Sequence, residues 1–498
     1  MDKFSWEKEP PAERREQGAW AGRPCYDCGF FRSNEAGPVL LLPAPKEWDC
    51  HMFDRSDAPD AHFEKYRIHY NRGAILAFVI GLLWRYYFIY YAHTPSRAEY
   101  IFSDMETHVL AANQLSDPAY IPNIADTIYP AGCIFFAGIY ILDPSWKMAV
   151  DLQFLLSAVL PLLVYALGRD LFGRRTAVYA LIASSLYFPF IDCAGFFLTE
   201  NPFMFFNLLS LWLLIRSLRT QSAWGAAAAA LLSGIFLGVA VSFKSFVVIS
   251  AGLIGVYLVW LAWRQRWRGL PLRLSAALIG LLAVMAPLTV RATRLNDGRF
   301  CLGSSTGAMN ILQGHHGNIG WVHFVDPKRN TRYKFGSAAS LQKHYDPLYL
   351  PCGPYDGAEI MAETRTWIQA HPIEALRLSV EHVFDLFINN EFWPGNMRFE
   401  RRWMTLFQEL FLIAILFPVL LLVVDYRWKL LKPEASGVLL ALLPLAGVMS
   451  AAFIAIGEIR YRVPFDPYLI LLASFWYATR PAAASAPVAA AGSALPQY

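Results

Sequence analysis

Two carboxylates and an imidazole lie within five residues of one another, at Asp104, Glu106 and His108. They follow the first long apolar segment, residues 73–92, by about a dozen residues. A carboxylate in a partly desolvated cleft can act as a general base, because burial and neighbouring charges tune its pKa. This position predicts chemistry at a membrane surface, with catalysis, transport and a purely structural role as the open alternatives.

The structural alternative is helix capping. Asp104 would be a good N-cap for a helix that starts at Met105. On such a helix Glu106 would point about 200° away from Asp104. Only an extended or capping conformation would then let both carboxylates face one ligand or one Mg²⁺ ion.

Composition places the chain among polytopic membrane proteins. Of its 498 residues, 56% are hydrophobic and only 16% are charged, whereas soluble proteins have about 25% charged residues. The net charge of +4 is small, and we expect no nucleic acid partner. Residues 1–72 are polar and lack the apolar core of a signal peptide, so we expect a cytoplasmic, partly disordered segment before an uncleaved first span.

Apolar runs of about 20 residues predict an all-α bundle of about ten membrane-spanning helices, within a range of about nine to thirteen. The runs are 73–92, 147–168, 174–191, 195–216, 223–243, 245–263, 272–290, 404–425, 436–456 and 463–478. The run 128–142 is shorter and contains Pro130, which predicts an interfacial or re-entrant helix. The Ala/Pro/Ser-rich segment 479–498 predicts a disordered tail.

Basic residues orient these spans, because loops rich in Lys and Arg stay in the cytoplasm. They fall in every second connection: Lys65, Arg67 and Arg72; Arg169, Arg174 and Arg175; Arg216 and Arg219; Arg264, Arg266, Arg268 and Arg273; and Arg427, Lys429 and Lys432. Both termini are therefore expected inside. Loop 93–146 and the segment 291–403 are expected outside, and the segment 291–403 is expected to form an α-rich or mixed domain. The membrane-spanning helices before that domain lie within residues 73–290, and those after it lie within residues 404–478.

The outer face then collects acids and cations, which are costly at a membrane boundary unless they are paired or functional. Transfer of a sugar from a lipid phosphate needs both: a base for the acceptor hydroxyl and cations for the departing phosphate. We expect the base to be Asp104 or Glu106. The expected cations are Lys244, Arg460, Arg462 and, at the outer end of the first span, Arg85.

Seven short motifs resemble those of integral-membrane glycosyltransferases of the C-type fold. In chain order they are Ser103-Asp104-Met105 with Ala111 to Leu115, Tyr129-Pro130-Ala131-Gly132, Gly168 to Arg175, Leu198-Thr199-Glu200-Asn201-Pro202, Phe243-Lys244, Gly307-Ala308-Met309-Asn310 with Gly314, and Arg460-Tyr461-Arg462-Val463-Pro464 with Pro467. The resemblance covers residues 73–478. The lipid A aminoarabinose transferases and the bacterial enzymes similar to protein O-mannosyltransferases are the nearest groups.

The resemblance implies inverting transfer of a sugar from a polyprenyl-phosphate donor, at the periplasmic face of the inner membrane, to an envelope lipid, glycan or protein. Asp104 takes the position of the first-loop acid, Glu200 that of a second acid, and Lys244 that of a cation near the donor phosphate. Three departures, Met105, His108 and Glu200, leave open the acceptor and the need for a divalent cation such as Mg²⁺ or Mn²⁺. A transporter or lipid flippase is the alternative from another class.

Other side chains allow further expectations. The expected substrate contacts are Tyr129, His108, His315 and His316, and the aromatic rings expected to stack on sugars are Trp321, Trp367 and Trp393. A zinc site formed by Cys25, Cys28, Cys50 and His51 has suitable ligand types, but Cys50 and His51 are adjacent and a second spaced pair is lacking. A disulfide between Cys301 and Cys352 on the outer side is left open.

Overall fold

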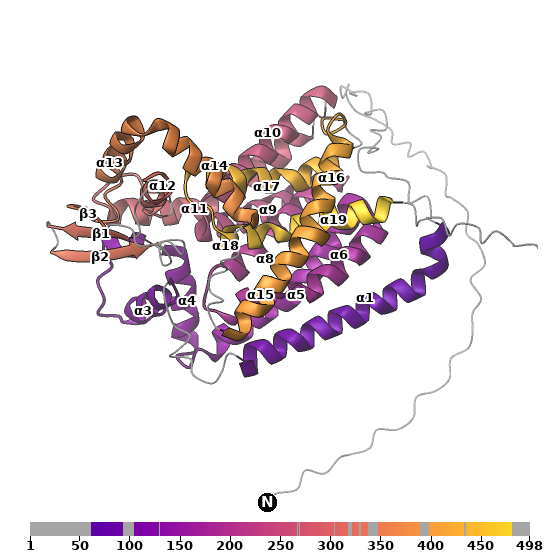
Figure 1. Ribbon diagram of the computed structural model, residues 1–498, viewed down its shortest axis with the longest axis horizontal. Helices are drawn as coiled ribbons and strands as arrows, with labels where there is room; N and C mark the ends of the chain where they lie inside the picture. Colours follow the sequence, from indigo (N-terminus) through magenta and orange to yellow (C-terminus); the bar gives the residue numbers. More distant parts are fainter. Residues whose placement is uncertain are drawn as a thin grey trace, which may run out of the picture. The chain divides into compact units, whose positions relative to one another are not determined.

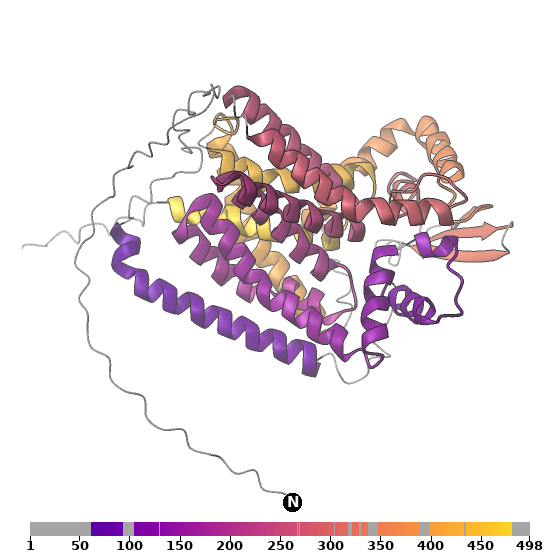
Figure 2. The ribbon, with the colours of Figure 1, turned by 180° about the vertical axis from the view of Figure 1, so that it is seen from behind.

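The computed structural model describes residues 61–92, 104–128, 130–265, 267, 269–302, 304–316, 321–327, 330–336, 347–388, 398–432 and 435–480. They fall within one compact unit, Cys50–Tyr498. Helices dominate, and one small sheet lies at the same end of the bundle as α3 (Asp104–Ser116) and α4 (Pro130–Leu142) (Figures 1 and 2).

Among the described residues, eight helices are long and apolar enough to cross a membrane, and a bent pair brings the number up to nine. The eight are α1 (Ala61–Tyr87) with η1 (Phe88–Ala92), α5 (Lys147–Phe172), α8 (Glu200–Arg219), α9 (Ala223–Phe243), α10 (Val247–Gln265), α11 (Leu270–Leu295), α15 (Arg398–Phe411) with η4 (Leu412–Leu416) and α16 (Phe417–Tyr426), and α17 (Ser436–Ile454). The predicted all-α polytopic fold is confirmed.

Two of the ten expected spans differ from simple crossings. The run 174–191 forms the bent pair α6 (Arg174–Leu186) and α7 (Phe188–Gly195), which meet at 47°. The run 463–478 forms η6 (Val463–Phe465) and α19 (Asp466–Thr479), a helix of 14 residues. Such a helix is about 21 Å long, shorter than the hydrocarbon core of about 30 Å.

Pro189 explains the break between α6 and α7. It stands in the first turn of α7, where its missing N–H group costs nothing, but it cannot donate a helical hydrogen bond to Ser185 four residues earlier. Arg85 of α1 supplies donors instead, with Nη1 2.6 Å from the Ser185 carbonyl oxygen and Nη2 3.2 Å from that of Ser184. Gly81 permits this approach, because a β-carbon there would lie 2.2 Å from Ser185 O.

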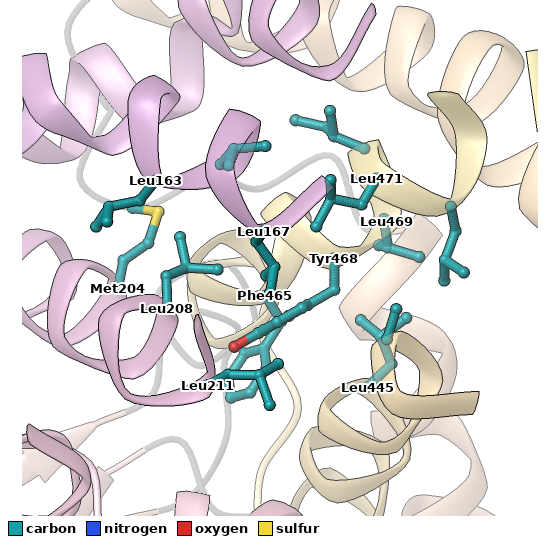
Figure 3. Packing of buried hydrophobic residues seen from close by; sticks show 14 of the residues in the cluster. Leu163, Leu167, Met204, Leu208, Leu211, Leu445, Phe465, Tyr468, Leu469 and Leu471 are labelled. Carbon is teal, nitrogen blue, oxygen red and sulfur yellow. The ribbon is translucent and has the colours of Figure 1, made fainter. Parts of the chain in front are cut away.

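The centre of the bundle is built around α19, whose side chains are buried on all sides from Asp466 to Phe475. A helix that is apolar all round belongs in a protein core or a membrane, which is why sequence alone predicts a span here. Figure 3 shows the apolar side chains that pack together: Leu163, Leu167, Met204, Leu208, Leu211, Leu445, Phe465, Tyr468, Leu469 and Leu471. The short helix α18 (Ile459–Arg462) leads directly into this core through η6.

The segment between α11 and α15, here called the insert, is mixed. It contains α12 (Gly307–His315), β1 (Trp321–Asp326), β2 (Thr331–Gly336), β3 (Leu348–Leu350), α13 (Gly357–Ala370) and α14 (Pro372–Ile388). The sheet order is β2-β1-β3, antiparallel between β1 and β2 and parallel between β1 and β3. Met309, Leu312, Val322, Phe324 and Ile360 form its apolar core.

Cys301 and Cys352 are both buried as thiols, so the disulfide left open by the sequence does not form in this structure. Cys352 packs in the apolar core of the insert. Cys301 follows α11, where its backbone N–H donates to the Thr293 hydroxyl at 3.2 Å.

The first loop packs against the insert. Its helix α4 has 13 residues, a length of about 20 Å that is too short to cross a membrane, in agreement with the expected interfacial or re-entrant helix. The short 3₁₀ helix η2 (Ile124–Thr127) precedes it, and the Thr127 hydroxyl lies 3.0 Å from that of Ser305. Ser304 donates to the carbonyl of Ile128 at 2.7 Å.

Candidate active site

Four charged side chains from four helix ends meet in one cluster. Asp104 begins α3, Glu200 begins α8, Lys244 follows the last residue of α9, and Arg460 lies within α18. The α8 and α9 helices run antiparallel, so the start of one and the end of the other lie at the same boundary of the bundle. We call Asp104, Glu200, Lys244 and Arg460 the boundary cluster.

Arg460 bridges the two acids of the boundary cluster. Its Nη2 lies 2.8 Å from Oδ2 of Asp104 and its Nε lies 3.6 Å from Oε1 of Glu200. The Lys244 ammonium lies 3.0 Å from the same Glu200 oxygen. Two acids and two cations make the cluster formally neutral, which reduces the cost of holding charges away from water.

Burial differs sharply between the two acids. The Glu200 side chain is 3% exposed, whereas that of Asp104 is 22% exposed. The second carboxylate oxygen of Glu200, Oε2, is buried and has no hydrogen-bond partner among the described residues. Buried acceptors of this kind are rare and call for an explanation, and a ligand that donates a hydrogen bond would supply one.

The charges of the cluster fix its protonation. Burial alone would raise the pKa of Asp104, but Arg460 and Lys244 more than offset it, so the pKa of this carboxyl lies below its ordinary value. Burial would lower the pKa of Arg460, but Asp104 and Glu200 hold that pKa well above its ordinary value. The pair Asp104–Arg460 is therefore ionised at neutral pH.

His108 lies one helical turn after Asp104 and is buried. Burial lowers the pKa of His108 to about 4, against the opposing effect of Asp104 and Glu200, so the ring is neutral at pH 7. Gly132 makes room for it, since a β-carbon at that position would lie 2.5 Å from Cε1 of His108. The ring packs on Phe136, with 5.5 Å between ring centroids.

Gln153 and Asn201 shape the turn that presents Glu200, and no sequence pattern indicates a role for Gln153. Gln153 Nε2 donates to the carbonyls of Phe196 and Leu198, at 3.2 and 3.1 Å. Asn201 Nδ2 donates to Oε1 of Gln153 at 2.6 Å. Both amides are buried, so they fix the chain on either side of Glu200.

Tyr461 is a second residue near the cluster that the sequence analysis did not single out for a role. Its ring centroid lies 5.6 Å from the Lys244 ammonium and 5.4 Å from the guanidinium carbon of Arg460. Both distances suit cation–π attraction. An aromatic residue directly after a candidate cation in the Arg460-Tyr461-Arg462 motif is the only signal that could have indicated it.

Two of the predicted cations lie outside the cluster. Arg85 is buried and satisfies carbonyls at the α6–α7 break, while its Nε donates to the Ser157 hydroxyl at 3.0 Å. Arg462 is also buried, 2.9 Å from the carboxylate of Asp466 and 3.1 Å from the Leu386 carbonyl oxygen. Bundle packing engages both guanidiniums, so neither of them joins Lys244 and Arg460 in the boundary cluster.

Other predicted residues are also separate from the cluster. Glu106 is exposed on α3, as its spacing from Asp104 on a helix requires. His315 donates from Nδ1 to the Ile311 carbonyl and pairs through Nε2 with the Ser379 hydroxyl, which ties α12 to α14. His316 stacks on Trp367 with 5.2 Å between centroids.

Several expectations fall outside the described residues. These are Tyr129, Trp393, the side chain of Trp321 and the zinc candidates Cys25, Cys28, Cys50 and His51. Trp367 is described, and it stacks with His371 as well as with His316. Imidazoles thus occupy ring surface that was expected to receive a sugar.

The boundary cluster does not fit a divalent cation. No three His, Cys, Asp or Glu residues in the described part of the chain come together as a metal site. Asp104 and Glu200 both face Arg460, and Glu200 also faces Lys244. A dication, which prefers several oxygen ligands, would meet two cations here.

A cavity of about 550 Å³ lies apart from the cluster, between α6, α15 with η4, and α19. Its walls are mainly apolar and include Leu186, Phe407, Phe411 and Ile470. None of the four cluster residues lines it. Its chemistry suits a hydrocarbon chain, so the charged cluster and not this cavity is the candidate site of reaction.

Comparison with known proteins finds a partial match to one family model. Residues 138–293 match the family described as dolichyl-phosphate-mannose-protein mannosyltransferase. The match covers less than half of the chain and includes Glu200 and Lys244. No curated protein matches the chain.

Among solved structures, the oligosaccharyltransferase of Archaeoglobus fulgidus, crystallised with a tethered acceptor peptide, is similar with a TM-score of 0.42 and 12% identity. The comparison covers 84% of this chain and 50% of that one, so this chain spans about half the length of that structure. A likeness this weak supports no argument. The family match, together with the polytopic helical architecture, confirms the resemblance to integral-membrane glycosyltransferases of the C-type fold and supports glycosyl transfer as the class of activity.

Proposed function

We propose that the chain transfers a sugar from a polyprenyl-phosphate donor to a hydroxyl acceptor, with inversion at the anomeric carbon. One observation supports this above all others: the boundary cluster joins a partly exposed carboxylate, Asp104, to cations at the edge of a membrane bundle. A reaction between a hydroxyl nucleophile and an anionic lipid needs these two parts side by side.

In the proposed step, the acceptor oxygen attacks the anomeric carbon as the bond from that carbon to the phosphate oxygen breaks. The hydroxyl proton passes to the Asp104 carboxylate, and the electron pair of the broken bond stays on the phosphate. Lys244 and Arg460 stabilise the charge that develops there. A single displacement of this kind inverts the configuration.

Glu200 has a different role in this proposal. Its Oε1 is bound to Lys244, so it holds the two cations in place. Its Oε2, which has no hydrogen-bond partner among the described residues, accepts a hydrogen bond from a sugar hydroxyl. Asp104, with the greater exposure, is the better proton acceptor for an incoming substrate. Neutral His108, beside Asp104, contributes shape and a single N–H donor.

The family description suggests the first donor to test, a polyprenyl-phosphate mannose. We propose an envelope protein, glycan or lipid as the acceptor, and leave the choice to experiment. The cavity lined by Phe407 and Phe411 suits the carrier's hydrocarbon chain by its apolar walls. The alternative function, that of a flippase, would move the same lipid across the membrane without breaking the bond between sugar and phosphate.

We also propose that the protein lies in the inner membrane of the cell. The boundary cluster and the insert would face the periplasm, and both termini would lie in the cytoplasm. The support is the charge pattern: Arg216 and Arg219 lie at the far end of α8 from Glu200, among loops that are basic throughout. Cysteine labelling at exposed Tyr349 of the insert tests this, and labelling from the cytoplasmic side would refute it.

The function is tested with the full chain reconstituted in lipid nanodiscs. Labelled polyprenyl-phosphate mannose is supplied with solubilised envelope extract, followed by polyprenyl phosphates carrying other sugars. We expect the label to leave the lipid and appear in a product. In that product the anomeric configuration of the transferred sugar, measured by NMR, should be the inverse of that in the donor. Intact donor in every case, together with movement of the lipid across a liposome bilayer, would favour the flippase instead.

A further inference from the structure

The loop between α17 and α18 passes between two helices of the insert. At Gly314 in α12, a β-carbon would lie 1.9 Å from the carbonyl oxygen of Ala455. At Gly457, two residues later in that loop, a β-carbon would lie 1.8 Å from the carbonyl oxygen of His382 in α14. Both distances are far below van der Waals contact, so both contacts require glycine.

His382 completes this arrangement. Its Nε2 lies 2.8 Å from the Gly314 carbonyl oxygen, and because a carbonyl only accepts, Nε2 carries the proton. The backbone of His382 thus meets the loop at Gly457, while its side chain holds α12 at Gly314. We call Gly314, His382 and Gly457 the glycine clasp.

The same helix, α14, also holds the other end of α18. The Leu386 carbonyl, one helical turn after His382, accepts from Nη1 of Arg462 at 3.1 Å. Gln408 reinforces this end, since it accepts from Nη2 of Arg462 at 3.2 Å and donates to the Phe387 carbonyl at 2.6 Å. Arg460 lies between the two attachments.

We propose that the glycine clasp is a positioning device for Arg460, the residue that bridges Asp104 and Glu200. Gly314, His382 and Gly457 touch neither acid in this assignment. They act through the path of the loop, because any outward shift of Gly457 from α14 moves the start of α18. The consequence for catalysis rests on the proposed function, whereas the consequence for the geometry of α18 does not.

The magnitude follows from the geometry. A methyl group placed 1.8 Å from an oxygen forces the loop and α14 apart by more than 1 Å, and a misplacement of about 1 Å at a reacting group costs about 10²-fold in rate. The insert and the boundary cluster are thus mechanically linked. An acceptor that shifts α14 would shift Arg460 as well.

The experiment compares three glycine variants of the full chain in nanodiscs. Gly457→Ala and Gly314→Ala should speed amide hydrogen exchange over residues 455–462 and lower kcat about 10²-fold. Gly307→Ala is the matched control, since it lies in the same helix as Gly314 with open space around its β-carbon position. It should keep wild-type exchange and a kcat within twofold.

A second pair of variants, at His382, covers the case in which Gly457→Ala or Gly314→Ala fails to fold. His382→Gln retains an amide N–H donor for Gly314 and should stay close to wild type, whereas His382→Ala should show faster exchange over 455–462 and roughly a tenfold loss of kcat. Wild-type exchange in folded Gly457→Ala, or in His382→Ala, overturns the clasp. If the unsubstituted protein transfers no sugar, the proposed function fails, and the exchange data still decide the clasp.

Discussion

The two ends of α8 each hold a buried carboxylate between two cations, and they differ in how its oxygens are used. At one end Asp170 Oδ1 lies 3.7 Å from Arg216 and 3.6 Å from Arg219, and Oδ2 accepts from the Trp212 indole at 3.0 Å. At the other end both cations contact Oε1 of Glu200, and Oε2 has no hydrogen-bond partner in the described part of the chain.

The difference separates a structural ion cluster from a candidate site. Around Asp170 every carboxylate oxygen is engaged, and the Arg216 side chain is 48% exposed, so water already screens the charge. Around Glu200 a second acid, Asp104, enters from a distant loop, and the cations are 14% exposed. A carboxylate whose two oxygens both have partners stabilises the fold. A buried charged cluster with a carboxylate oxygen that lacks a partner among the described residues can interact strongly with an incoming ligand.

The strongest test of this comparison replaces one acid at each end. Asp104→Asn removes the proposed base and should lower kcat about 10²- to 10⁴-fold at neutral pH, with little change in the amount of folded protein. Asp170→Asn should cost on the order of 2 kcal/mol of stability and leave kcat per folded molecule within about twofold. Initial rates and thermal unfolding of both variants measure this. Wild-type turnover by Asp104→Asn would remove the catalytic assignment.

The next test replaces one cation at each end. Lys244→Ala removes a donor to the departing phosphate and should lower turnover about 10²-fold. Lys244→Arg should recover part of this loss, because the charge remains while its geometry changes. Arg216→Ala, at an exposed pair worth about 1 kcal/mol or less, should keep full activity. Equal losses in Lys244→Ala and Arg216→Ala, measured as kcat per folded molecule, would erase the distinction between the two ends.

The sequence predicted the boundary cluster because its members share two simple properties. Asp104, Glu200, Lys244 and Arg460 are charged, and the order of apolar runs assigns all four to one side of the membrane. Opposite charges confined to one boundary pair with one another, since leaving them unpaired is costly. Their meeting therefore follows from topology and electrostatics.

Two of the expected cations lie outside the boundary cluster because of backbone contacts that topology does not encode. Arg85 and Arg462 carry the same charge as Arg460, but carbonyl groups freed at the α6–α7 break and near the end of α14 engage them. Gln153 and Gly457 carry no charge and gave no pattern to detect. The run 463–478 illustrates a related limit, because a core helix and a membrane helix are equally apolar.

A smaller effect concerns acid. His108 has a pKa of about 4 when folded, against an ordinary 6.5, so between these values the unfolded chain binds a proton that the folded chain does not. Stability therefore falls as the pH drops from about 6.5 towards 4. At pH 4.5 this residue alone should cost about 2 to 3 kcal/mol relative to pH 7.

The measurement is thermal unfolding between pH 7 and pH 4.5, a range that ends above the ordinary pKa of 3.8 for Asp104. His108→Gln should flatten the pH dependence relative to the unsubstituted chain. His315 and His316, whose pKa values are also lowered by burial, remain in both proteins. An unchanged slope in His108→Gln would mean that His108 takes up its proton over the same pH range in the folded and the unfolded chain.

The smallest expected effect is that of removing metal ions. Both acids of the boundary cluster already face cations, and a divalent ion bound there would have to displace Arg460 from Asp104 and overcome repulsion from Lys244. Treatment with EDTA should therefore change the initial rate less than about twofold. A loss that Mg²⁺ or Mn²⁺ restores would show that substrate binding rearranges the cluster, with Arg460 leaving its acids before the sugar moves. That result would make Glu200, whose Oε2 lacks a partner among the residues that the structure describes, the first metal ligand to test by Glu200→Gln. Asp170→Asn at the opposite end of α8 is the matched control.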